Sequence, residues 1–367
     1  MLFRSVLPAA FEKVSIYHIN NPDASWATRG AAGEPPVVAQ AYSFDGDYLR
    51  DAGRAKIAAA ASSLPRGCDV AIYGRHVDSD EEEDEDLAEP DSTVAAAEVA
   101  EALAGRQIKR LVFENFSGMG PRLGRALGAA GAEHLRLFSV GLTDQGSVAL
   151  AEAVAASVAG GTMRHLGLWQ VRYPARLLLD LGAALQRGGP GPSFELEVLG
   201  YSEALAAAVH AALATVLGRV SLLSLKIYDG GELLAVGSQA LLRLELRFEA
   251  EAVQQQLPFR FDAAPALESV LLKYVFPSEA APLLVALASD PNLPALRAVK
   301  LVVAQEGDRK SPHPAPLAPV ADGLRRALEQ RAGGAAAGAA SGEWRVEVER
   351  EPSGRGWGVI RVSRIQQ

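Results

Sequence analysis

Three glycines in one short stretch are the first residues in this sequence that could do chemistry. Gly118, Gly120 and Gly124 lie within SGMGPRLG. Glycine-rich loops bind phosphate because the missing side chains let backbone N–H groups approach an anion. The spacing here matches neither GxGxxG nor a P-loop, and no lysine follows it. We therefore interpret the stretch as a turn between strands.

Two histidines occupy matching places in the sequence. His134 and His165 each precede a leucine-x-leucine pair, and neighbouring strands would bring them about 5 Å apart. A structural metal site needs about four ligands, but the corresponding places on the flanking strands hold Arg110 and Glu195. We expect solvated histidines and no metal site. No serine or cysteine has a recognisable base and orienting acid, so we predict no catalytic residue, no cofactor and a protein that is not an enzyme.

An acidic run carries most of the net charge of −8. Ten carboxylates lie between Asp78 and Asp91, and subtracting them from the 44 acidic residues leaves 34 against 36 basic ones. The rest of the chain is therefore near neutral, and we expect no nucleic-acid partner. The run lacks the spaced oxygen ligands and central glycine of a calcium loop. Three interpretations stay open: a solvated disordered loop, which we favour, a docking site for a basic partner, and a divalent-cation site.

The elements that must position such residues can be read from Leu135–Ala155, LRLFSVGLTDQGSVALAEAVA. Its opening alternates apolar and polar residues, which is typical of a strand with one buried face. A threonine and an aspartate that can cap a helix follow, and apolar residues then recur at helical spacing. One strand and one helix cannot bury their own apolar side, so the unit needs neighbours. The residues predicted to form the buried face of the helix are Val148, Leu150, Val154 and Val158.

The same pattern recurs along the chain. From Leu111 to Val299 the strand cores follow at steps of 21 to 31 residues with a mean near 27, as in repeat proteins. The predicted strand cores are Val70–Ile72, Leu111–Phe113, Leu135–Leu137, Leu166–Leu168, Leu196–Val198, Leu223–Leu225, Leu244–Leu246, Val270–Leu272 and Val299–Leu301. The predicted helices are Thr93–Leu103, Pro121–Ala130, Gln145–Val158, Ala175–Gln186, Glu203–Leu217, Glu251–Leu257 and Ser278–Ala288, whereas DGGELLAVGSQA predicts a turn or a stub of helix.

The repeat resembles the leucine-rich repeat of the ribonuclease-inhibitor and Ran GTPase-activating-protein type, LxLxx(N/C)xL followed by T-D-x-G and a helix. Here the pattern reads Leu135, Leu137, Val140, Leu142, Thr143, Asp144, Gly146 and Leu150. The resemblance implies an α/β solenoid, a horseshoe or arc with a parallel sheet on the concave face and helices on the convex face. The usual asparagine ladder is missing, so we expect an irregular arc. Its positions hold Val140, Val171, Tyr201, Tyr228 and Val275.

The predicted organisation has three parts. Residues 1–67 form an irregular N-terminal cap or degenerate first repeat, with a strand at Val14–Ile19 and a helix at Tyr48–Leu64. Residues 68–304 form the solenoid, with the acidic insertion 78–91. Residues 305–367 hold a proline-rich linker, a helix at Val320–Gln330 and a C-terminal β-hairpin. A (β/α)₈ barrel is the alternative architecture, but both faces of barrel strands are covered, and charged residues alternate with the leucines here.

The open face of the predicted sheet is the expected binding surface. Positions directly after the second leucine carry aromatic residues in the early repeats and cations in the later ones, and such residues form interface hot spots. We predict a non-enzymatic scaffold that holds a protein partner there, with a GTPase activator or ubiquitin-ligase substrate adaptor as the alternative. The single cysteine, the weak signal-peptide character and the lack of a long apolar run favour a soluble cytoplasmic protein, without a membrane partner, in a larger complex. The predicted partner-binding residues are Tyr73, Phe138, Trp169, Lys226, Arg247 and Lys273.

Overall fold

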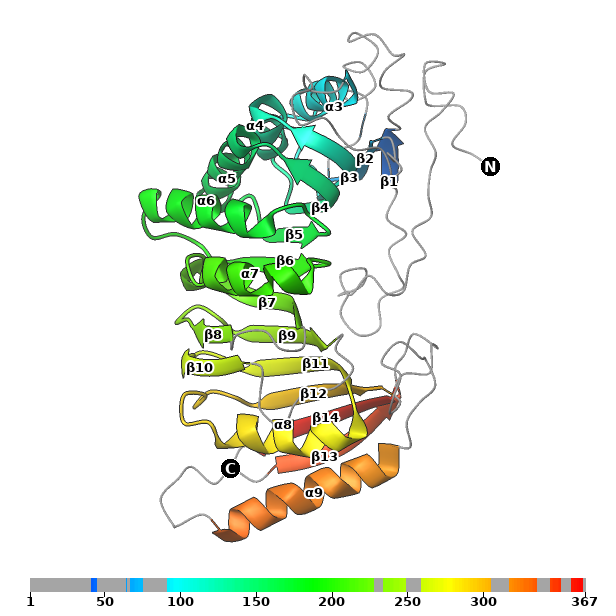
Figure 1. Ribbon diagram of the computed structural model, residues 1–367, viewed down its shortest axis with the longest axis vertical. Helices are drawn as coiled ribbons and strands as arrows, with labels where there is room; N and C mark the ends of the chain where they lie inside the picture. Colours follow the sequence, from blue (N-terminus) through cyan, green and yellow to red (C-terminus); the bar gives the residue numbers. More distant parts are fainter. Residues whose placement is uncertain are drawn as a thin grey trace, which may run out of the picture. The chain divides into compact units, whose positions relative to one another are not determined.

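The computed structural model describes residues 41–44, 64, 67–74, 91–227, 234–248, 259–304, 317–334, 344–350 and 358–365 (Figure 1). The chain divides into two compact units, Met1–Phe194 and Glu195–Gln367, here called unit 1 and unit 2. Each unit is described by itself. In both, the described strands form a mostly parallel sheet accompanied by helices, so the predicted α/β class is confirmed.

The sheet of unit 1 is parallel, and its strands follow the chain order. Its members are β1 (Ala41–Phe44), β2 (Asp69–Tyr73), β3 (Arg110–Met119), β4 (His134–Leu142) and β5 (His165–Trp169). Equivalent leucines of the repeat pair in register, because Leu111 lies beside Leu135 and Leu135 beside Leu166. All three are at most 1% exposed, so the leucine columns form the core.

Four helices lie along one side of this sheet (Figure 1). They are α3 (Asp91–Ala102), α4 (Pro121–Ala129), α5 (Asp144–Ala159) and α6 (Pro174–Arg187). Each packs against the next in sequence order. Helix α5 begins as predicted, because the Thr143 hydroxyl accepts a hydrogen bond from the Gly146 N–H at 3.0 Å.

The glycines of SGMGPRLG have structural roles. Gly118 lies in β3 with φ 65°, Gly120 is the N-cap of α4, and Gly124 faces α5. A Cβ at Gly124 would lie 2.9 Å from the Gly146 carbonyl oxygen, and one at Gly128 would lie 2.1 Å from the Cβ of Ala153. These glycines therefore let α4 and α5 approach each other closely.

Unit 2 continues the strand pattern. Its main sheet contains β6 (Phe194–Leu199), β7 (Val220–Ile227), β9 (Arg243–Phe248), β11 (Ser269–Val275) and β12 (Ala298–Val303) in that order, and the neighbours from β7 to β12 are parallel. Leu223, Leu244, Val270 and Val299 pair in register and are at most 1% exposed. The helical elements that follow strands here are η2 (Glu203–Leu205), α7 (Ala206–Leu213), η3 (Leu217–Arg219) and α8 (Pro277–Ser289).

Three short strands, β1, β8 (Leu234–Gly237) and β10 (Phe259–Ala263), were not predicted from the sequence. Strand β8 lies within DGGELLAVGSQA, so the predicted turn or helix stub is wrong there, and it pairs in parallel with β10. Val236 and Phe261 are buried at 0% and 3% exposed. These side chains pack in the core of unit 2. A segment interrupted by glycines can still place an apolar side chain in the core when its backbone is extended.

The C-terminal helix and hairpin were predicted correctly. Helix α9 (Leu317–Gly334) precedes β13 (Trp344–Arg350) and β14 (Gly358–Arg364), which pair antiparallel. Strand β14 also pairs antiparallel with β12 and so extends the main sheet, which the sequence did not indicate. The Arg325 guanidinium of α9 donates to the Val346 carbonyl oxygen at 3.2 Å, which ties the helix to the hairpin.

Other predictions have mixed outcomes. All nine predicted strand cores lie in strands, but Val148 is wrong as a core residue because it is 37% exposed on the outer side of α5. The sequences at Val14–Ile19, Glu251–Leu257 and 78–90 lie outside the described residues, as do Tyr228 and almost all of Tyr48–Leu64. In the described part of the chain, no helix combines the length and apolar character needed to cross a membrane.

Candidate binding face

The open face of each sheet is defined here as the face that the buried leucines do not use. In unit 1 its shape depends on three residues with left-handed backbones at one position of neighbouring strands: Asn115 (φ 60°), Ser139 (φ 50°) and Gln170 (φ 52°). The left-handed conformation interrupts the alternation of buried and exposed side chains along β4. Phe138 and Ser139 are therefore both partly exposed, and Val140, the next residue, is buried again. The Ser139 hydroxyl donates to the Gln170 side-chain oxygen at 2.9 Å. The open face of β4 therefore carries two successive, partly exposed residues, Phe138 and Ser139.

The three aromatic residues predicted to bind a partner lie in one row. Register places Tyr73 beside Glu114, Glu114 beside Phe138, and Phe138 beside Trp169. The ring centroids of Phe138 and Trp169 are 6.3 Å apart at 43°, a favourable tilted geometry. Tyr73 is separated from this pair by a carboxylate, so the aromatic contact joins two of the three predicted residues.

An arginine that sequence reasoning missed completes this cluster. The guanidinium carbon of Arg136 lies 3.4 Å from the centroid of the Trp169 ring, within the range of a cation–π contact. Arg136 pairs in register with Gly167, and a Cβ there would lie 3.4 Å from its Cγ. The glycine thus leaves room for the arginine to cross to the next strand. Phe138, Trp169 and Arg136 are called the aromatic shelf below.

A carboxylate adjoins the aromatic shelf. Burial raises the pKa of Glu114 above its ordinary value, and the nearby positive charge of Arg136 partly opposes that rise. The carboxylate of Glu114 loses part of its hydration at this site, and that loss disfavours its charged form. A partner that buries it further would raise its pKa again unless it also brings a hydrogen-bond donor.

The first row of the open face contains Asp69, Arg110, His134 and His165 in register. The two imidazole centroids are 5.6 Å apart, as the sequence predicted. Asp69 and Arg110 form an ion pair at 3.5 Å, yet burial raises the pKa of Asp69 and lowers that of Arg110. Burial thus outweighs the attraction for both partners. Among the described residues, no group of three or more histidine, cysteine, aspartate or glutamate side chains could hold a metal ion.

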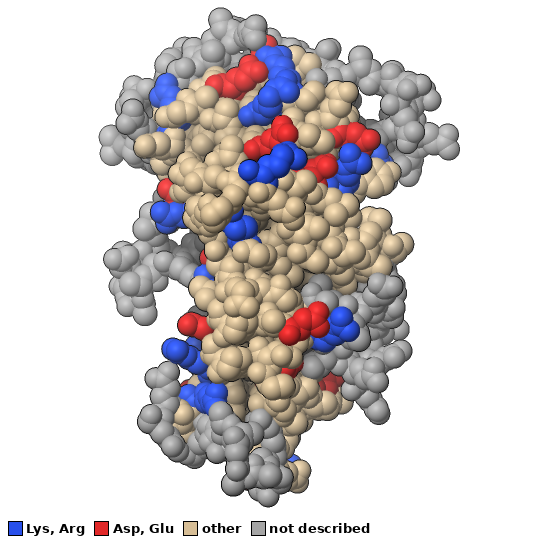
Figure 2. Space-filling view, turned by 90° about the vertical axis from the view of Figure 1, so that its left-hand side faces the viewer, with Lys and Arg blue, Asp and Glu red and all other residues tan. Residues whose placement is uncertain are grey.

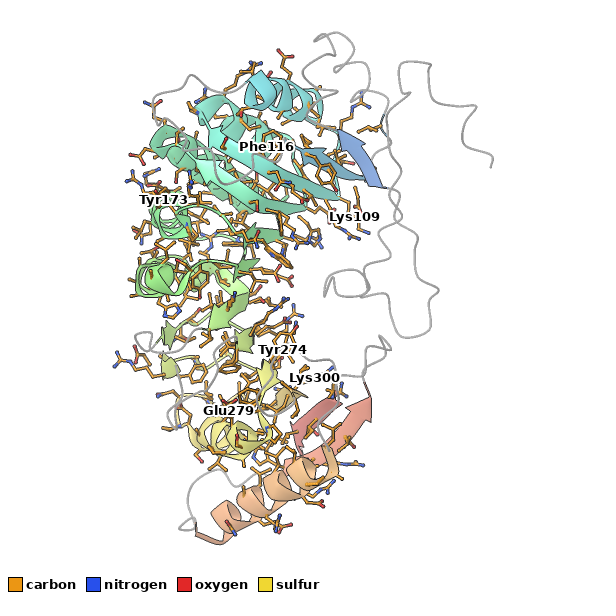
Figure 3. The ribbon with its side chains drawn as sticks, turned by 45° about the vertical axis from the view of Figure 1, so that its right-hand side comes forward. Lys109, Phe116, Tyr173, Tyr274, Glu279 and Lys300 are labelled. Atoms are coloured by element: carbon orange, nitrogen blue, oxygen red, sulfur yellow. The ribbon has the colours of Figure 1, made fainter. Side chains whose placement is uncertain are left out.

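The three cations predicted to bind a partner form a row on the open face of unit 2. Lys226, Arg247 and Lys273 are neighbours in register on β7, β9 and β11, and they are called the cation row below. Arg247 pairs with Glu197 at 3.5 Å and Lys273 with Glu245 at 3.4 Å. The sequence showed these glutamates on alternating positions but did not indicate that they compensate the cations. Figure 3 shows Tyr274 and Lys300 on the side of the sheet opposite to α8, which carries Glu279.

Burial dominates the ionisation of Lys273. It lowers the pKa of the ammonium group, and the neighbouring charge of Arg247 lowers it further. Glu245 and Glu197 act in the opposite direction. The cation row is therefore a site where positive charges are held close together and partly out of water.

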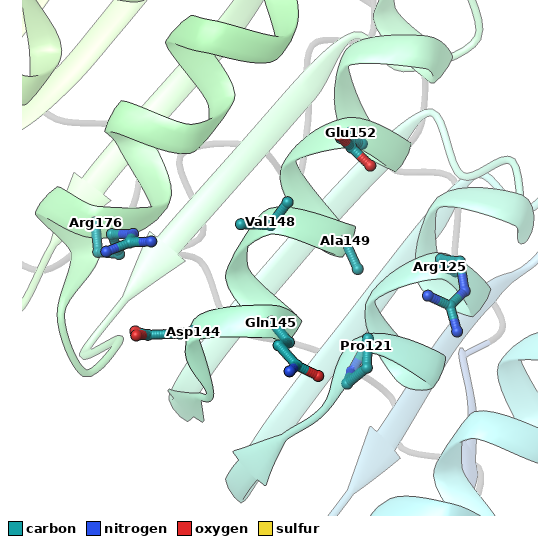
Figure 4. Close-up of a pocket in the computed structure, with 8 residues that line it drawn as sticks. All are labelled: Pro121, Arg125, Asp144, Gln145, Val148, Ala149, Glu152 and Arg176. Atoms are coloured by element: carbon teal, nitrogen blue, oxygen red, sulfur yellow. The ribbon is translucent and has the colours of Figure 1, made fainter.

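The helix side of unit 1 offers a second, weaker candidate. A shallow groove of about 370 Å³ runs between α4, α5 and α6, with Val148 in its middle and charged residues around it (Figure 4). These charges are largely compensated, because Arg176 pairs with Asp180 at 3.1 Å and Glu152 with Arg187 at 3.0 Å. Figure 2 shows basic and acidic side chains interleaved over this side. Among the described residues, the helix side of unit 1 therefore has no extended surface of a single charge that would attract a charged partner.

Comparison with models of known protein families gave no match, and neither did comparison with curated proteins.

Proposed function

We propose that this chain is a leucine-rich-repeat solenoid that acts as a non-enzymatic scaffold and holds a protein partner on the concave, open face of its sheet. In this proposal the aromatic shelf is the apolar anchor, and the cation row of unit 2 contributes charge. The protein would work in the cytoplasm as a subunit of a larger complex. The in-register leucine columns support the repeat interpretation.

The observation that carries the proposal is the packing of Arg136 on Trp169 beside Phe138. The guanidinium lies 3.4 Å from the indole centroid, and the two rings are 6.3 Å apart. Aromatic and arginine side chains dominate interface hot spots, particularly where they are already held in place before binding. Phe138 and Trp169 are half-buried, so they lose little conformational freedom on binding and still offer apolar area.

The backbone next to the aromatic shelf supports the same conclusion. Asn115, Ser139 and Gln170 adopt left-handed conformations, which cost a non-glycine residue of order 1–3 kcal/mol each. Such strain concentrates at functional sites, because the surrounding structure must hold it. Here it brings polar side chains to the border of an apolar pair, as in an interface with an apolar centre and a polar rim.

Site-specific photo-crosslinking tests the proposal directly. Phe138→p-benzoylphenylalanine in the full chain, irradiated in extract of the native cell, should give a discrete adduct with one protein. The matched control is Leu179→p-benzoylphenylalanine, because Leu179 is 48% exposed on α6, on the helix side. We expect no such adduct at position 179. Adding Trp169→Ala to the Phe138 variant should abolish the adduct.

Two results would count against the proposal. An adduct at position 179 without one at position 138 would move the interface to the helices. An adduct at position 138 that persists unchanged with Trp169→Ala would show that proximity alone, without the aromatic shelf, explains the crosslink. Thermal denaturation of each variant shows whether it keeps the wild-type fold.

A further inference from the structure

A carboxylate interrupts the row of aromatic residues on the open face of unit 1. Glu114 lies in register between Tyr73 on β2 and Phe138 on β4. Neighbouring strands are about 4.8 Å apart, so an aromatic residue stands on each side of the carboxylate. All three residues are partly exposed. They form one accessible surface, which is called the Glu114 site below.

The charge of Glu114 is only partly compensated. Among the described residues, its carboxylate makes no hydrogen bond or ion pair, and Arg136 is the charged group that favours its ionised form. The guanidinium of Arg136 packs on the ring of Trp169. Trp169 lies two strands from Glu114 in register, about 10 Å by strand spacing. Burial therefore prevails over this distant attraction and raises the pKa of Glu114.

The backbone around Glu114 is held firmly in place. The Gly74 N–H donates to the Glu114 carbonyl oxygen at 2.7 Å, so the contact between the two chain segments continues past Tyr73. A Cβ at Gly74 would lie 1.9 Å from the Asn115 carbonyl oxygen, which shows how closely these segments approach. Asn115 itself has a left-handed backbone with φ 60°. The backbone that carries the carboxylate is therefore fixed before a ligand binds, and a preorganised site loses less freedom on binding.

Aromatic rings beside a carboxylate suit an organic cation. The ring faces attract the cation, and the carboxylate accepts its charge-assisted hydrogen bonds. A metal ion needs more oxygen ligands than one carboxylate supplies, and the described residues contain no group of three or more metal-ligating side chains. A lysine or arginine side chain needs only this acceptor and an apolar surface for its methylene groups. Val112, partly exposed on the same face of β3, adds such a surface.

We propose that Glu114, between Tyr73 and Phe138, binds a lysine or arginine side chain of the protein partner. This inference rests on the proposed function and names the partner's chemistry next to the aromatic shelf. The partner segment would place an apolar residue on Phe138 and Trp169, and a basic residue one strand further along the row, about 5 Å away. Pairing of the two charges would fix the direction in which the segment lies across the strands.

The test selects random heptapeptides displayed on phage for binding to the immobilised full chain, at near-physiological ionic strength. Wild type should enrich peptides that carry a lysine or arginine next to an apolar residue. Glu114→Gln keeps the shape of the side chain and removes its charge, so it should lose the preference for a basic residue and keep the preference for an apolar one. Glu133→Gln is the matched control, because Glu133 is exposed directly before β4 and outside the row. It should select the same peptides as wild type.

A double-mutant cycle on the best selected peptide measures the contact itself. Replacing the basic residue of the peptide by norleucine and making Glu114→Gln should each weaken binding about tenfold, and both changes together should weaken it no further. The melting temperature of Glu114→Gln should be at least that of wild type, because the variant removes a charge that burial disfavours.

Four results would overturn the inference. Enrichment of apolar residues alone would remove the basic side chain and leave the aromatic shelf, and with it the proposed function, in place. Basic residues enriched equally on Glu114→Gln would place their contact elsewhere, for example on the acidic run 78–91. Additive losses in the cycle would show that the two groups do not meet, and no enriched peptide would remove the site. Crosslinking at Phe138 uses the native partner, so it tests the proposed function independently of these peptides.

Discussion

Truncating one leucine measures how much the repeat core contributes to stability. Leu137 in β4 is 0% exposed and lies in register between Phe113 and Leu168. Leu137→Ala removes three buried carbon groups, worth about 0.8 kcal/mol each or about 2.4 kcal/mol in transfer free energy. A cavity that the flanking strands cannot fill adds to this loss, so we expect a total of about 2–5 kcal/mol.

Urea denaturation followed by far-ultraviolet circular dichroism is the appropriate assay. Val148→Ala is the matched control, because Val148 belongs to the same repeat but is 37% exposed. It should change the free energy of unfolding by no more than about 0.5 kcal/mol. A Leu137→Ala midpoint equal to wild type would refute the burial of the leucine column. A Val148→Ala loss as large as that of Leu137→Ala would refute the assignment of inner and outer sides to α5.

Three further predictions follow from local geometry. Gly128→Ala should lower the melting temperature, at a cost of about 1–3 kcal/mol, because its Cβ would clash with α5, whereas Gly218→Ala, with nothing within 4 Å, should not. Thr143→Ala should cost about 1 kcal/mol in chemical denaturation by removing the cap of α5, and Thr143→Ser should restore most of it. Cys68 should react slowly with a thiol reagent at pH 8 until the protein is unfolded, because burial raises the pKa of its thiol to about 11. Rapid labelling of the native protein would contradict that last expectation.

The Cys68 thiol also implies a direction for the pH dependence of stability. Its pKa rises from an ordinary value of 9.0 to about 11 on folding, chiefly because of burial and then because of Asp69. Between these values the folded state keeps a proton that the unfolded state has lost. The contribution to stability is therefore fully present below pH 9.0 and is lost as the pH rises through about 11.

Most of the fold could be predicted from the leucine pattern, because the burial of one strand face imposes that pattern directly. A strand with one face in the core must alternate, and all nine predicted strand cores, including Leu135–Leu137 and Val299–Leu301, lie in strands. Strand β8 could not be predicted in this way, since glycines and a short apolar run fit a turn equally well. Val148 was misassigned because helical spacing alone does not distinguish a wide apolar stripe from a narrow one.

The sequence predicted which residues lie on the open face but not which contacts they make with one another. Alternation placed Phe138, Trp169 and Arg247 on it, and register brought the first two together. The contact of Arg136 with Trp169 depends on the gap at Gly167 in the next strand, which only an aligned comparison of neighbouring repeats could have suggested. Ion pairs such as Arg247–Glu197 depend on side-chain reach across strands, and a sequence gives no direct signal for that.

The most direct test of the central claim is the affinity of the partner captured at position 138 for two variants of the full chain. Calorimetric titration should show that Trp169→Ala weakens binding by roughly 2 kcal/mol, or about 30-fold, at low and at high ionic strength alike. Leu179→Ala, which removes a 48% exposed side chain from α6, should bind as tightly as wild type. Wild-type affinity for Trp169→Ala, in a variant that keeps the wild-type melting temperature, would contradict the aromatic shelf as the binding site.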